Sequence, residues 1–358
     1  MRVLVGLSGG VDSSVVACLL KEQGHEVIGA TMSIWDKNED FNFNLPKEGC
    51  FAPHDEDIEL ARQLAQKLDI EYHVIDCTSV YKKIVLENFK QEYLNGHTPN
   101  PCVICNSKIK FDALPCGAKT QGIAFDKFAT GHYARLSYNE QTNRYQLKRG
   151  VDNKKDQSYF IYRLTQEQLS NILMPLGTFT KEEVRALAQK YNLETSTKKD
   201  SQDFYTGNIN DIIKQPPLKG NFVDKTGKIL GTHDGIWNFT IGQRRGLGIS
   251  ADRPLYVTDL KKSTNEVVLG YKEDGQTNEI YVSDINWLSI PNLKSESLIK
   301  VKVRSTGIPV DATYTIINDN LSKLTFANPE NAIACGQSAV FYDENDFVLG
   351  GGFIKKEQ

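Results

Sequence analysis

The sequence predicts an α/β protein in which a doubly wound, mostly parallel sheet is followed by a small β domain and a C-terminal β-barrel. Three observations support this fold class. Over about the first 200 residues, apolar runs of strand length alternate with amphipathic helical patterns, which is typical of a parallel sheet covered by helices. Beyond about residue 210, short alternating strands with glycine turns replace that pattern. At 358 residues the chain is too long for one core, so two or three domains are expected.

The elements of the α/β part follow from the apolar periodicity. Strands are expected at residues 2–7, 25–32, 71–75 and 127–130, and helices from residue 12, over 55–68, over 80–93 and from about residue 107. Two further helices are marked by capping boxes, in which an N-cap hydroxyl and a side chain three residues later satisfy each other's amides. The two boxes are Thr165 with Gln168 and Thr180 with Glu183.

The change of pattern along the chain predicts the domain limits. We expect an α/β domain over residues 1–208, a small central β-rich domain over 209–276 and a β-barrel over 277–358. The stretches NFVDKTGKILGTHDG and SAVFYDENDFVLGGGFI carry the alternating pattern of the two later domains.

Composition and charge exclude several classes of protein. Apolar residues make up 40% and charged residues 24% of the chain, as in an ordinary globular protein. The net charge of -3 excludes a strongly basic protein. A nucleic-acid partner would therefore have to bind at a local patch of positive charge. The apolar run in MRVLVGLSGG is too short for a signal peptide or a membrane span. The odd count of seven cysteines indicates a reducing compartment, and we expect a cytoplasmic protein without membrane contact.

A loop suited to binding an anion follows the first strand. In GLSGGVDSS, residues 6–14, two adjacent glycines let backbone amides converge, and the next helix directs its positive end at the same place. The stretch matches neither a Walker A loop nor G-x-G-x-x-G. It is similar to the pyrophosphate loop (PP-loop) of ATP pyrophosphatases, adenine nucleotide alpha hydrolase-like enzymes that split ATP between the α and β phosphates. That resemblance implies that Asp12 helps to hold magnesium. It also implies that ATP is bound by Gly6, Leu7, Ser8, Gly9, Gly10, Val11, Asp12 and Ser13.

Seven later stretches resemble the bacterial tRNA-specific 2-thiouridylases of the MnmA/TrmU family. In order along the chain they are GATMSIW, TPNPCVICNSKIKF, ATGHYAR, KKDQSYFIYRL, PLGTFTKEEVR, KKDSQDF and FTIGQRRGLGI. The resemblance implies a tRNA-uridine 2-sulfurtransferase, which uses ATP to adenylate the wobble uridine of tRNA and then replaces the C2 oxygen by sulfur. A cysteine persulfide would deliver the sulfur, because it stays nucleophilic at neutral pH when neighbouring donors lower the thiol pKa.

The same resemblance implies partners and residue roles. The partners would be tRNA and a sulfur donor, either a persulfide carrier protein or a cysteine desulfurase. Met32 would line the adenine pocket and Gly131 would border the nucleotide. The residues implied to contact tRNA are Asn100, Pro101 and Cys102 at the target base, Lys155, Asp156 and Gln157 in a later strip, and Arg304 and Ser305 on the barrel.

Ordinary structural roles stay open for some of these residues. Met32, at a strand end, is as well suited to the core as to an adenine site. His132 can equally have a structural role, as a histidine in a loop whose ring is held by hydrogen bonds. In KVKVR, residues 300–304, cations alternate with valines, which predicts cations facing outward on any half-exposed strand.

The cysteines depart from the family pattern. Where most members have P-N-P-D-x-x-C-N, this chain has PNPCVICN, so Cys105 takes the family's nucleophile position and Cys102 replaces the aspartate. The later family motif S-Q-D-x-C is SQDFY here, which puts Tyr205 in the position of the persulfide-carrying cysteine. Because tyrosine cannot carry a persulfide, we predict that sulfur transfer has moved to Cys102 and Cys105, on a loop leading into a helix. One would bear the persulfide and the other would resolve it as a disulfide, so Cys105, Cys102 and Asp12 form the predicted catalytic set.

Two metal sites are alternatives for the C-x-x-C pair. An iron–sulfur cluster would need a third ligand, and the candidates are Cys50, Cys77, Cys116 and Cys335, of which Cys335 is expected to be distant. Cys18 is disfavoured because its helix is expected to be buried. A zinc ion would instead combine the pair with Cys50 and His54.

Two other functions are compatible with parts of the sequence. The S-G-G-x-D-S-S loop also occurs in amidotransferases and synthetases that adenylate small molecules, although these usually lack the cysteine loop and the β domains. The missing second cysteine would also fit a catalytically altered tRNA-binding homologue.

Overall fold

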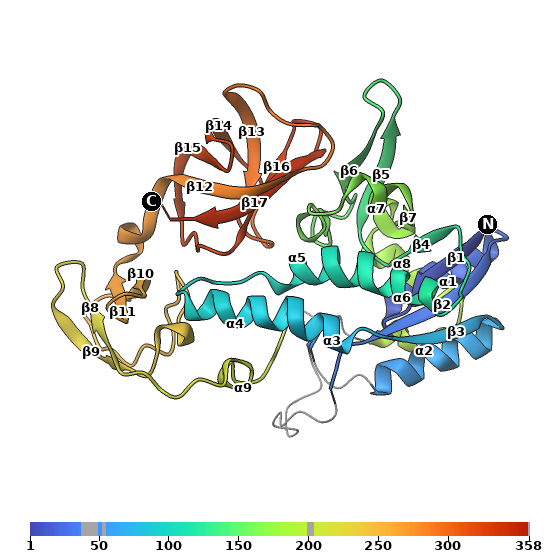
Figure 1. The fold of residues 1–358 in the computed structure, drawn as a ribbon, viewed down its shortest axis with the longest axis horizontal. Helices are drawn as coiled ribbons and strands as arrows, with labels where there is room; N and C mark the ends of the chain where they lie inside the picture. The colour runs from blue at the N-terminus through green and yellow to red at the C-terminus, as the bar shows by residue number, and fades with distance from the viewer. Residues whose placement is uncertain (37–48, 52–54, 199–203, 357–358) are drawn as a thin grey trace.

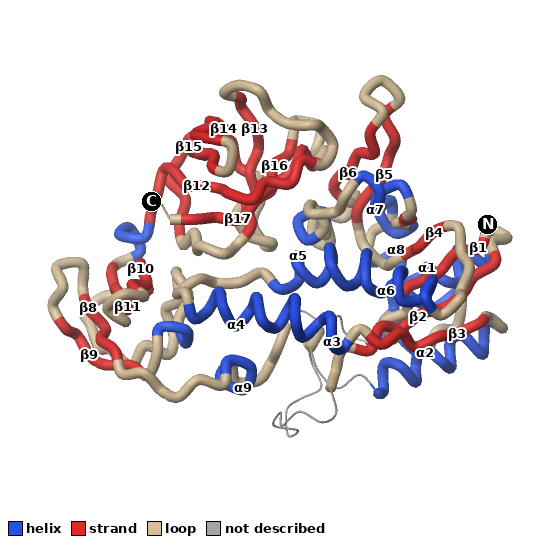
Figure 2. The backbone as a smooth tube through the Cα atoms, in the orientation of Figure 1, coloured by secondary structure: helices blue, strands red, loops and turns tan. Residues whose placement is uncertain are grey.

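The computed structural model describes residues 1–36, 49–51, 55–198 and 204–356. Figures 1 and 2 show an α/β domain at the N-terminal end of the chain, a small β sheet and a β-barrel at its C-terminal end. The predicted fold class is confirmed. None of the described helices is long and apolar enough to cross a membrane.

The α/β domain is built on a five-stranded parallel sheet with the order β3-β2-β1-β4-β7. Its strands are β1 (Arg2–Gly6), β2 (Glu26–Ser33), β3 (Glu71–Asp76), β4 (Lys127–Ala129) and β7 (Ile172–Leu173). The chain adds strands first on one side of β1 and then on the other, so the carboxyl ends of β1 and β4 meet at a topological switch point. Ligands of open α/β sheets bind at such a point.

Different helices cover the two faces of β1, whose central residues are fully buried. Val3 and Val5 pack in a core with α1 (Val11–Glu22), α2 (Asp55–Leu68) and α8 (Lys181–Lys190). Leu4 faces the other way, into a core shared with the helical segment of residues 101–120. Apolar burial on both faces explains why β1 is a continuous apolar run in the sequence.

Two long helical segments run side by side from the α/β domain toward the small β sheet (Figure 1). Their parts are α3 (Thr78–Tyr81), η1 (Lys82–Leu86) and α4 (Glu87–Leu94), then α5 (Pro101–Cys105), η2 (Asn106–Ala113) and α6 (Leu114–Thr120). Both η1 and η2 are π-helical, a conformation frequent at functional sites. The second segment begins at Pro101 and not near residue 107 as predicted, because proline at N1 is already set for a helix. Cys102 and Cys105 therefore lie on the helix itself, and their predicted place on a loop is wrong.

Both predicted capping boxes are confirmed. Thr165 and Gln168 cap α7 (Gln166–Ser170), and Thr180 and Glu183 cap α8. The other elements of this part are β5 (Ala134–Asn139), β6 (Arg144–Arg149), η3 (Ser158–Phe160), η4 (Pro175–Thr178), η5 (Glu194–Thr197) and α9 (Asn210–Ile213).

The β-rich parts are a four-stranded sheet, ordered β10-β11-β8-β9, and a closed barrel, ordered β12-β15-β14-β13-β16-β17. The sheet and its neighbours comprise β8 (Gly220–Val223), β9 (Ile229–His233), η6 (Ile236–Asn238), β10 (Tyr256–Lys261), β11 (Glu266–Gly270) and η7 (Lys272–Gly275). The barrel comprises β12 (Gln276–Trp287), β13 (Ser297–Lys302), β14 (Val310–Asn318), β15 (Leu321–Asn331), β16 (Ser338–Tyr342) and β17 (Val348–Lys355). Barrel residues Val340, Tyr342 and Val348 share a core with the α/β domain, so the two pack as one unit.

Asp156 lies in the contact between the α/β domain and the barrel. Its side chain is fully enclosed, and Oδ2 is 3.1 Å from Nε of Arg149 and 4.0 Å from Nζ of Lys302. Oδ1 accepts hydrogen bonds from the backbone N–H groups of Gly150 and Ser158, each at 3.1 Å. The expectation that KVKVR turns its cations outward is wrong for Lys302, because the α/β domain covers that side of the barrel. The carboxylate of Asp156 contacts protein groups, and its predicted contact with tRNA stays a prediction.

We expect Asp156→Asn to lower the free energy of unfolding by about 3–5 kcal/mol, because it removes the charge that faces the buried Lys302 and one of the two carboxylates that pair with Arg149. Urea denaturation followed by circular dichroism measures this. Asp311→Asn is the matched control, because Asp311 pairs with Lys300 on the exposed outside of the barrel and should cost less than about 1 kcal/mol. Equal losses in the two variants would contradict the assigned role of Asp156.

Candidate active site

The loop between β1 and α1 forms an anion cradle at the switch point. Gly9 has a φ of +67°, and a Cβ there would lie 2.5 Å from the backbone oxygen of Asp57, so only glycine fits. The N-cap of α1 is Gly10, which has no capping side chain, and the first amides of the helix are therefore left for a ligand. The Ser8 N–H donates to Oγ of Ser13 over 3.1 Å, which fixes the turn.

Asp12, in the first turn of α1, is bound by two side chains from later in the sequence. Nζ of Lys181 lies 2.7 Å from Oδ1 and 2.8 Å from Oδ2 of Asp12. The hydroxyl of Tyr133 donates to Oδ1 over 2.8 Å. Sequence reasoning missed both residues, although they lie in the quoted stretches PLGTFTKEEVR and ATGHYAR. Lys181 is the first residue after the N-cap Thr180. The capping box was interpreted only as the start of a helix, and a role for Lys181 in the site was overlooked.

A second lysine closes the other side of the cradle. Nζ of Lys198 donates to the backbone oxygen of Gly9 over 3.1 Å and also contacts the carboxylate of Asp57. The stretch KKDSQDF therefore starts against the phosphate loop. Residues 199–203 of that stretch lie outside the described residues. Two cations thus flank a loop whose amides also favour an anion.

The structure brings the other predicted nucleotide residues to the same edge of the sheet. Gly131 follows β4, and a Cβ there would lie 2.9 Å from Cβ of Asp12 and 3.0 Å from the backbone N of Ser13. Met32 is half-buried near the carboxyl end of β2, where it packs against the core. Both positions suit the predicted roles, and contact with the nucleotide itself stays a prediction.

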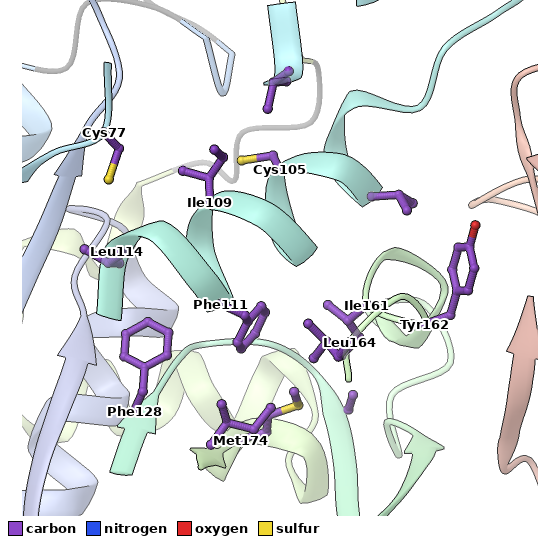
Figure 3. Close-up of a cluster of buried hydrophobic side chains, with 14 of the residues drawn as sticks. Cys77, Cys105, Ile109, Phe111, Leu114, Phe128, Ile161, Tyr162, Leu164 and Met174 are labelled. Carbon is purple, nitrogen blue, oxygen red and sulfur yellow. The ribbon is translucent and has the colours of Figure 1, made fainter. Parts of the chain in front are cut away.

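Cys102 and Cys105 lie one helical turn apart on α5. Cys105 is buried and Cys102 is half-buried. Figure 3 shows the sulfur atom of Cys105 among apolar side chains that include Ile109. Burial raises the pKa of Cys102 to about 12 and that of Cys105 to about 11. The expectation that neighbouring donors lower these pKa values is therefore wrong for the protein alone, because desolvation outweighs the one nearby cation.

That cation is Lys110, which sequence reasoning also missed. Burial would lower the pKa of Lys110, but the sulfurs of Cys105, Cys50 and Cys102 raise it, and their effect is larger. Lys110 lies on η2, in the stretch TPNPCVICNSKIKF. It therefore belongs to one electrostatic site with three thiols.

The segment of residues 130–133 connects this thiol site with the phosphate loop. The hydroxyl of Tyr133 contacts Asp12 in the phosphate loop. The ring of His132 lies 5.3 Å from that of Phe111, and Nδ1 lies 2.8 Å from Oγ1 of Thr130. Burial, reinforced by the charge of Lys110, lowers the pKa of His132 to about 3. His132 is therefore a neutral, buried link between the two halves of the site.

Because the pKa of His132 is lower when folded than its ordinary value of 6.5, its contribution to stability is present above pH 6.5 and is lost as the pH falls toward 3. We expect it to cost about 2 kcal/mol of unfolding free energy between pH 7 and pH 5. In His132→Gln this part of the pH dependence should disappear. Urea denaturation at both pH values measures the difference, and an unchanged pH dependence in the variant would refute the assignment.

The barrel holds the loop that precedes Cys102. The Thr98 N–H donates to the backbone oxygen of Cys335 over 2.8 Å, and Nε2 of Gln337 donates to the backbone oxygen of Pro99 over 2.9 Å. Cys335 is therefore close to Thr98, although the charges that shift its pKa come from Lys356, Asp259, Lys355 and Glu92 and not from Cys102 or Cys105. Asn100 and Pro101 are buried, and Asn100 shares a side-chain hydrogen bond with Tyr159.

The remaining predicted tRNA contacts lie on two separate parts of the protein. Lys155 and Gln157 are half-buried beside the α/β domain, and Oε1 of Gln157 accepts the Tyr133 N–H over 3.0 Å. Arg304 is exposed on the barrel, where it contacts the backbone oxygen of Asn331, and Ser305 is half-buried next to it. Their contacts with RNA stay predictions.

The seven cysteines, all among the described residues, form no disulfide. Within the described part of the chain, no group of three or more histidine, cysteine, aspartate or glutamate side chains is arranged to hold a metal ion. The zinc alternative involves His54, which lies outside that part. The iron–sulfur cluster stays a prediction.

Three family models match the chain in succession: a tRNA methyl transferase HUP domain at residues 1–205, a tRNA methyl transferase PRC-barrel domain at 208–271 and an aminomethyltransferase beta-barrel domain at 277–354. A tRNA-specific 2-thiouridylase MnmA from Endomicrobium trichonymphae is 48% identical over 356 residues, covering 99% of each chain. The chain belongs to the tRNA-specific 2-thiouridylase family. A 2-thiouridylase from Clostridium botulinum (strain Alaska E43 / Type E3) is 45% identical over 99% of this chain and 98% of its own. One from Acetivibrio thermocellus is 44% identical over 99% of each.

Proposed function

We propose that the protein uses ATP to thiolate the wobble uridine of tRNA at C2. The observation that carries the proposal is the connection of a two-lysine phosphate cradle around Asp12 to a thiol site around Lys110, through residues 130–133. Adenylation needs an anion site, and sulfur delivery needs thiols. Membership of the 2-thiouridylase family supports the same function.

In the first step, the C2 oxygen of uridine attacks the α phosphate of ATP and pyrophosphate leaves. The amides at the start of α1 and the ammonium group of Lys181 would bind the phosphate oxygens, which gain charge in the transition state. The carboxylate of Asp12, a hard oxygen donor beside the cradle, would hold a magnesium ion once Lys181 turns from it to the phosphates. When bound, that ion supplies charge neutralisation for the departing pyrophosphate.

In the second step, a persulfide on Cys102 attacks C2, and AMP leaves. Cys105 then attacks the Sγ of Cys102, which releases 2-thiouridine and closes a Cys102–Cys105 disulfide. Side chains three residues apart on a helix lie about 5–6 Å apart at Cβ, so a modest adjustment brings the sulfurs together. A cellular dithiol would then reduce the disulfide.

The proposed reaction also suggests the partners and the cellular location of the protein. We propose tRNA and a persulfide-bearing donor protein as its partners, and the cytoplasm as its location. We also propose residues 1–208 as the catalytic domain, 209–276 as a central domain and 277–358 as a tRNA-contacting barrel.

Pyrophosphate release separates the proposed function from the adenylation of a small molecule. The protein is incubated with ATP and magnesium, with and without unmodified tRNA. We expect release to increase at least tenfold with tRNA. Release that is equally fast without tRNA but responds to a small carboxylic acid or amide would favour a synthetase or amidotransferase.

A further inference from the structure

Tyr205 occupies the position at which this family's second motif ends, and a neighbouring segment supplies a cysteine beside it. The Phe51 N–H donates to the backbone oxygen of Phe204 over 2.8 Å. The ring of Phe51 is stacked on that of Phe204 at 5.9 Å and lies 6.2 Å from that of Tyr205. Cys50, the residue before Phe51, is therefore held alongside residues 204–205.

Phe51 fixes the position of this segment against the thiol site. It is 2% exposed and belongs to the same core as Cys105. Its ring also stacks on that of Tyr81 at 5.6 Å. Cys50 itself is exposed. The exposed thiol of Cys50 therefore directly precedes Phe51, which enters the core that encloses the buried thiol of Cys105.

The electrostatics of the site place Cys50 near both partners of the C-x-x-C pair. A negative charge on Cys50 raises the pKa of Cys102 and of Cys105, although burial is the larger cause in both. It also raises the pKa of Lys110. Because the influence of a charge falls with distance and screening, these effects agree with the position of Phe51 in the core of Cys105 and place Cys50 in the same site as the pair.

We propose that Cys50 is the thiol that accepts sulfur from the donor and passes it to the Cys102–Cys105 pair. The inference rests on the proposed function and adds a third thiol to it. A donor protein needs an accessible sulfur, and among the thiols of this site Cys105 is buried, Cys102 is half-buried and Cys50 is exposed. Cys50 would then take the role that a cysteine at position 205 has in most members of the family.

The transfer balances in two exchanges. The donor's persulfide gives its outer sulfur to the Cys50 thiolate, which forms a new S–S bond and leaves the donor as a thiolate. The Cys102 thiolate then attacks the outer sulfur on Cys50, so that one S–S bond forms, one breaks and Cys50 returns as a thiolate. Neither exchange has a net oxidant or reductant, and Lys110 offers a cation to each thiolate in turn.

Cys116 provides a matched control. It is also exposed, but it lies on α6, and the charges that shift its pKa come from Asp112, Lys119 and Glu167 and not from the thiol site. Cys116→Ser therefore removes an exposed thiol of the same kind without touching the proposed route.

The test compares two sulfur sources for tRNA thiolation by wild type, Cys50→Ser and Cys116→Ser. With glutathione persulfide, Cys50→Ser should be at least tenfold slower than the other two. With sodium sulfide, which can attack the adenylated uridine directly, all three should be equal. Full persulfide-dependent activity in Cys50→Ser would overturn the inference, as would an equal loss with both sulfur sources.

Peptide mapping gives a second measurement that does not depend on the variant's folding. Wild type is treated with glutathione persulfide, alkylated and digested, and the extra sulfur is located by mass spectrometry. We expect it first on Cys50 and later on Cys102; its appearance on Cys102 without any on Cys50 would contradict the inference. Failure of the proposed function looks different, because wild type would then form no 2-thiouridine from either source.

Discussion

Cys105→Ser should lose persulfide-dependent tRNA thiolation by on the order of a hundredfold or more while it keeps tRNA-dependent pyrophosphate release. Serine cannot close the disulfide with Cys102, so the modified uridine should stay attached to Cys102 through an S–S bond. The variant should therefore accumulate a covalent enzyme–tRNA adduct, visible on a denaturing gel and released by dithiothreitol.

Two comparisons make this prediction specific. Cys102→Ser should lose thiolation equally but form no adduct, because it lacks the sulfur that attacks C2. Cys18→Ser removes a buried thiol from the other core of the α/β domain and should keep most of the thiolation activity. Full persulfide-dependent activity in either Cys102→Ser or Cys105→Ser would refute the paired role.

Asp12→Asn and Lys181→Met should each slow pyrophosphate release by about 10²–10³-fold, the loss typical when a group that stabilises transition-state charge is removed. The two side chains hold each other in the phosphate cradle, so the double variant should be scarcely slower than the worse single variant. A steady-state pyrophosphate assay with saturating tRNA measures all three.

The same two helices offer the control. Glu22 of α1 pairs with Lys190 of α8 at the other end of the helices, where both side chains are exposed. Glu22→Gln should leave pyrophosphate release unchanged. Comparable losses in Glu22→Gln and Asp12→Asn would show that helix packing, and not the phosphate cradle, limits the rate.

The sequence predicts the parts of the fold that depend on local signals. The alternation of strands and helices, both capping boxes and the glycine loop all have short-range physical causes, and the structure has them where they were expected. The start of α5 was missed because the cysteine motif was interpreted as a loop, although Pro101 is a good first residue of a helix.

Features that depend on the packing of distant segments could not be predicted from the sequence. Lys181 and Asp12 are in contact although they lie 169 residues apart in the sequence. The periodicity of apolar residues carries no information on such a contact. Lys302 has the spacing of an outward-facing residue, and only the docking of the barrel onto the α/β domain encloses it. The raised pKa values of Cys102 and Cys105 likewise follow from burial by distant segments.

Mass spectrometry of tRNA nucleosides tests the central claim most directly. Unmodified tRNA is incubated with the protein, ATP, magnesium and either glutathione persulfide or sodium sulfide, and is then digested to nucleosides. We predict 2-thiouridine at the wobble position from both sulfur sources, with one pyrophosphate and one AMP released for each sulfur inserted. Pyrophosphate release without any thiolated nucleoside, or thiolation without ATP, would contradict the proposed function.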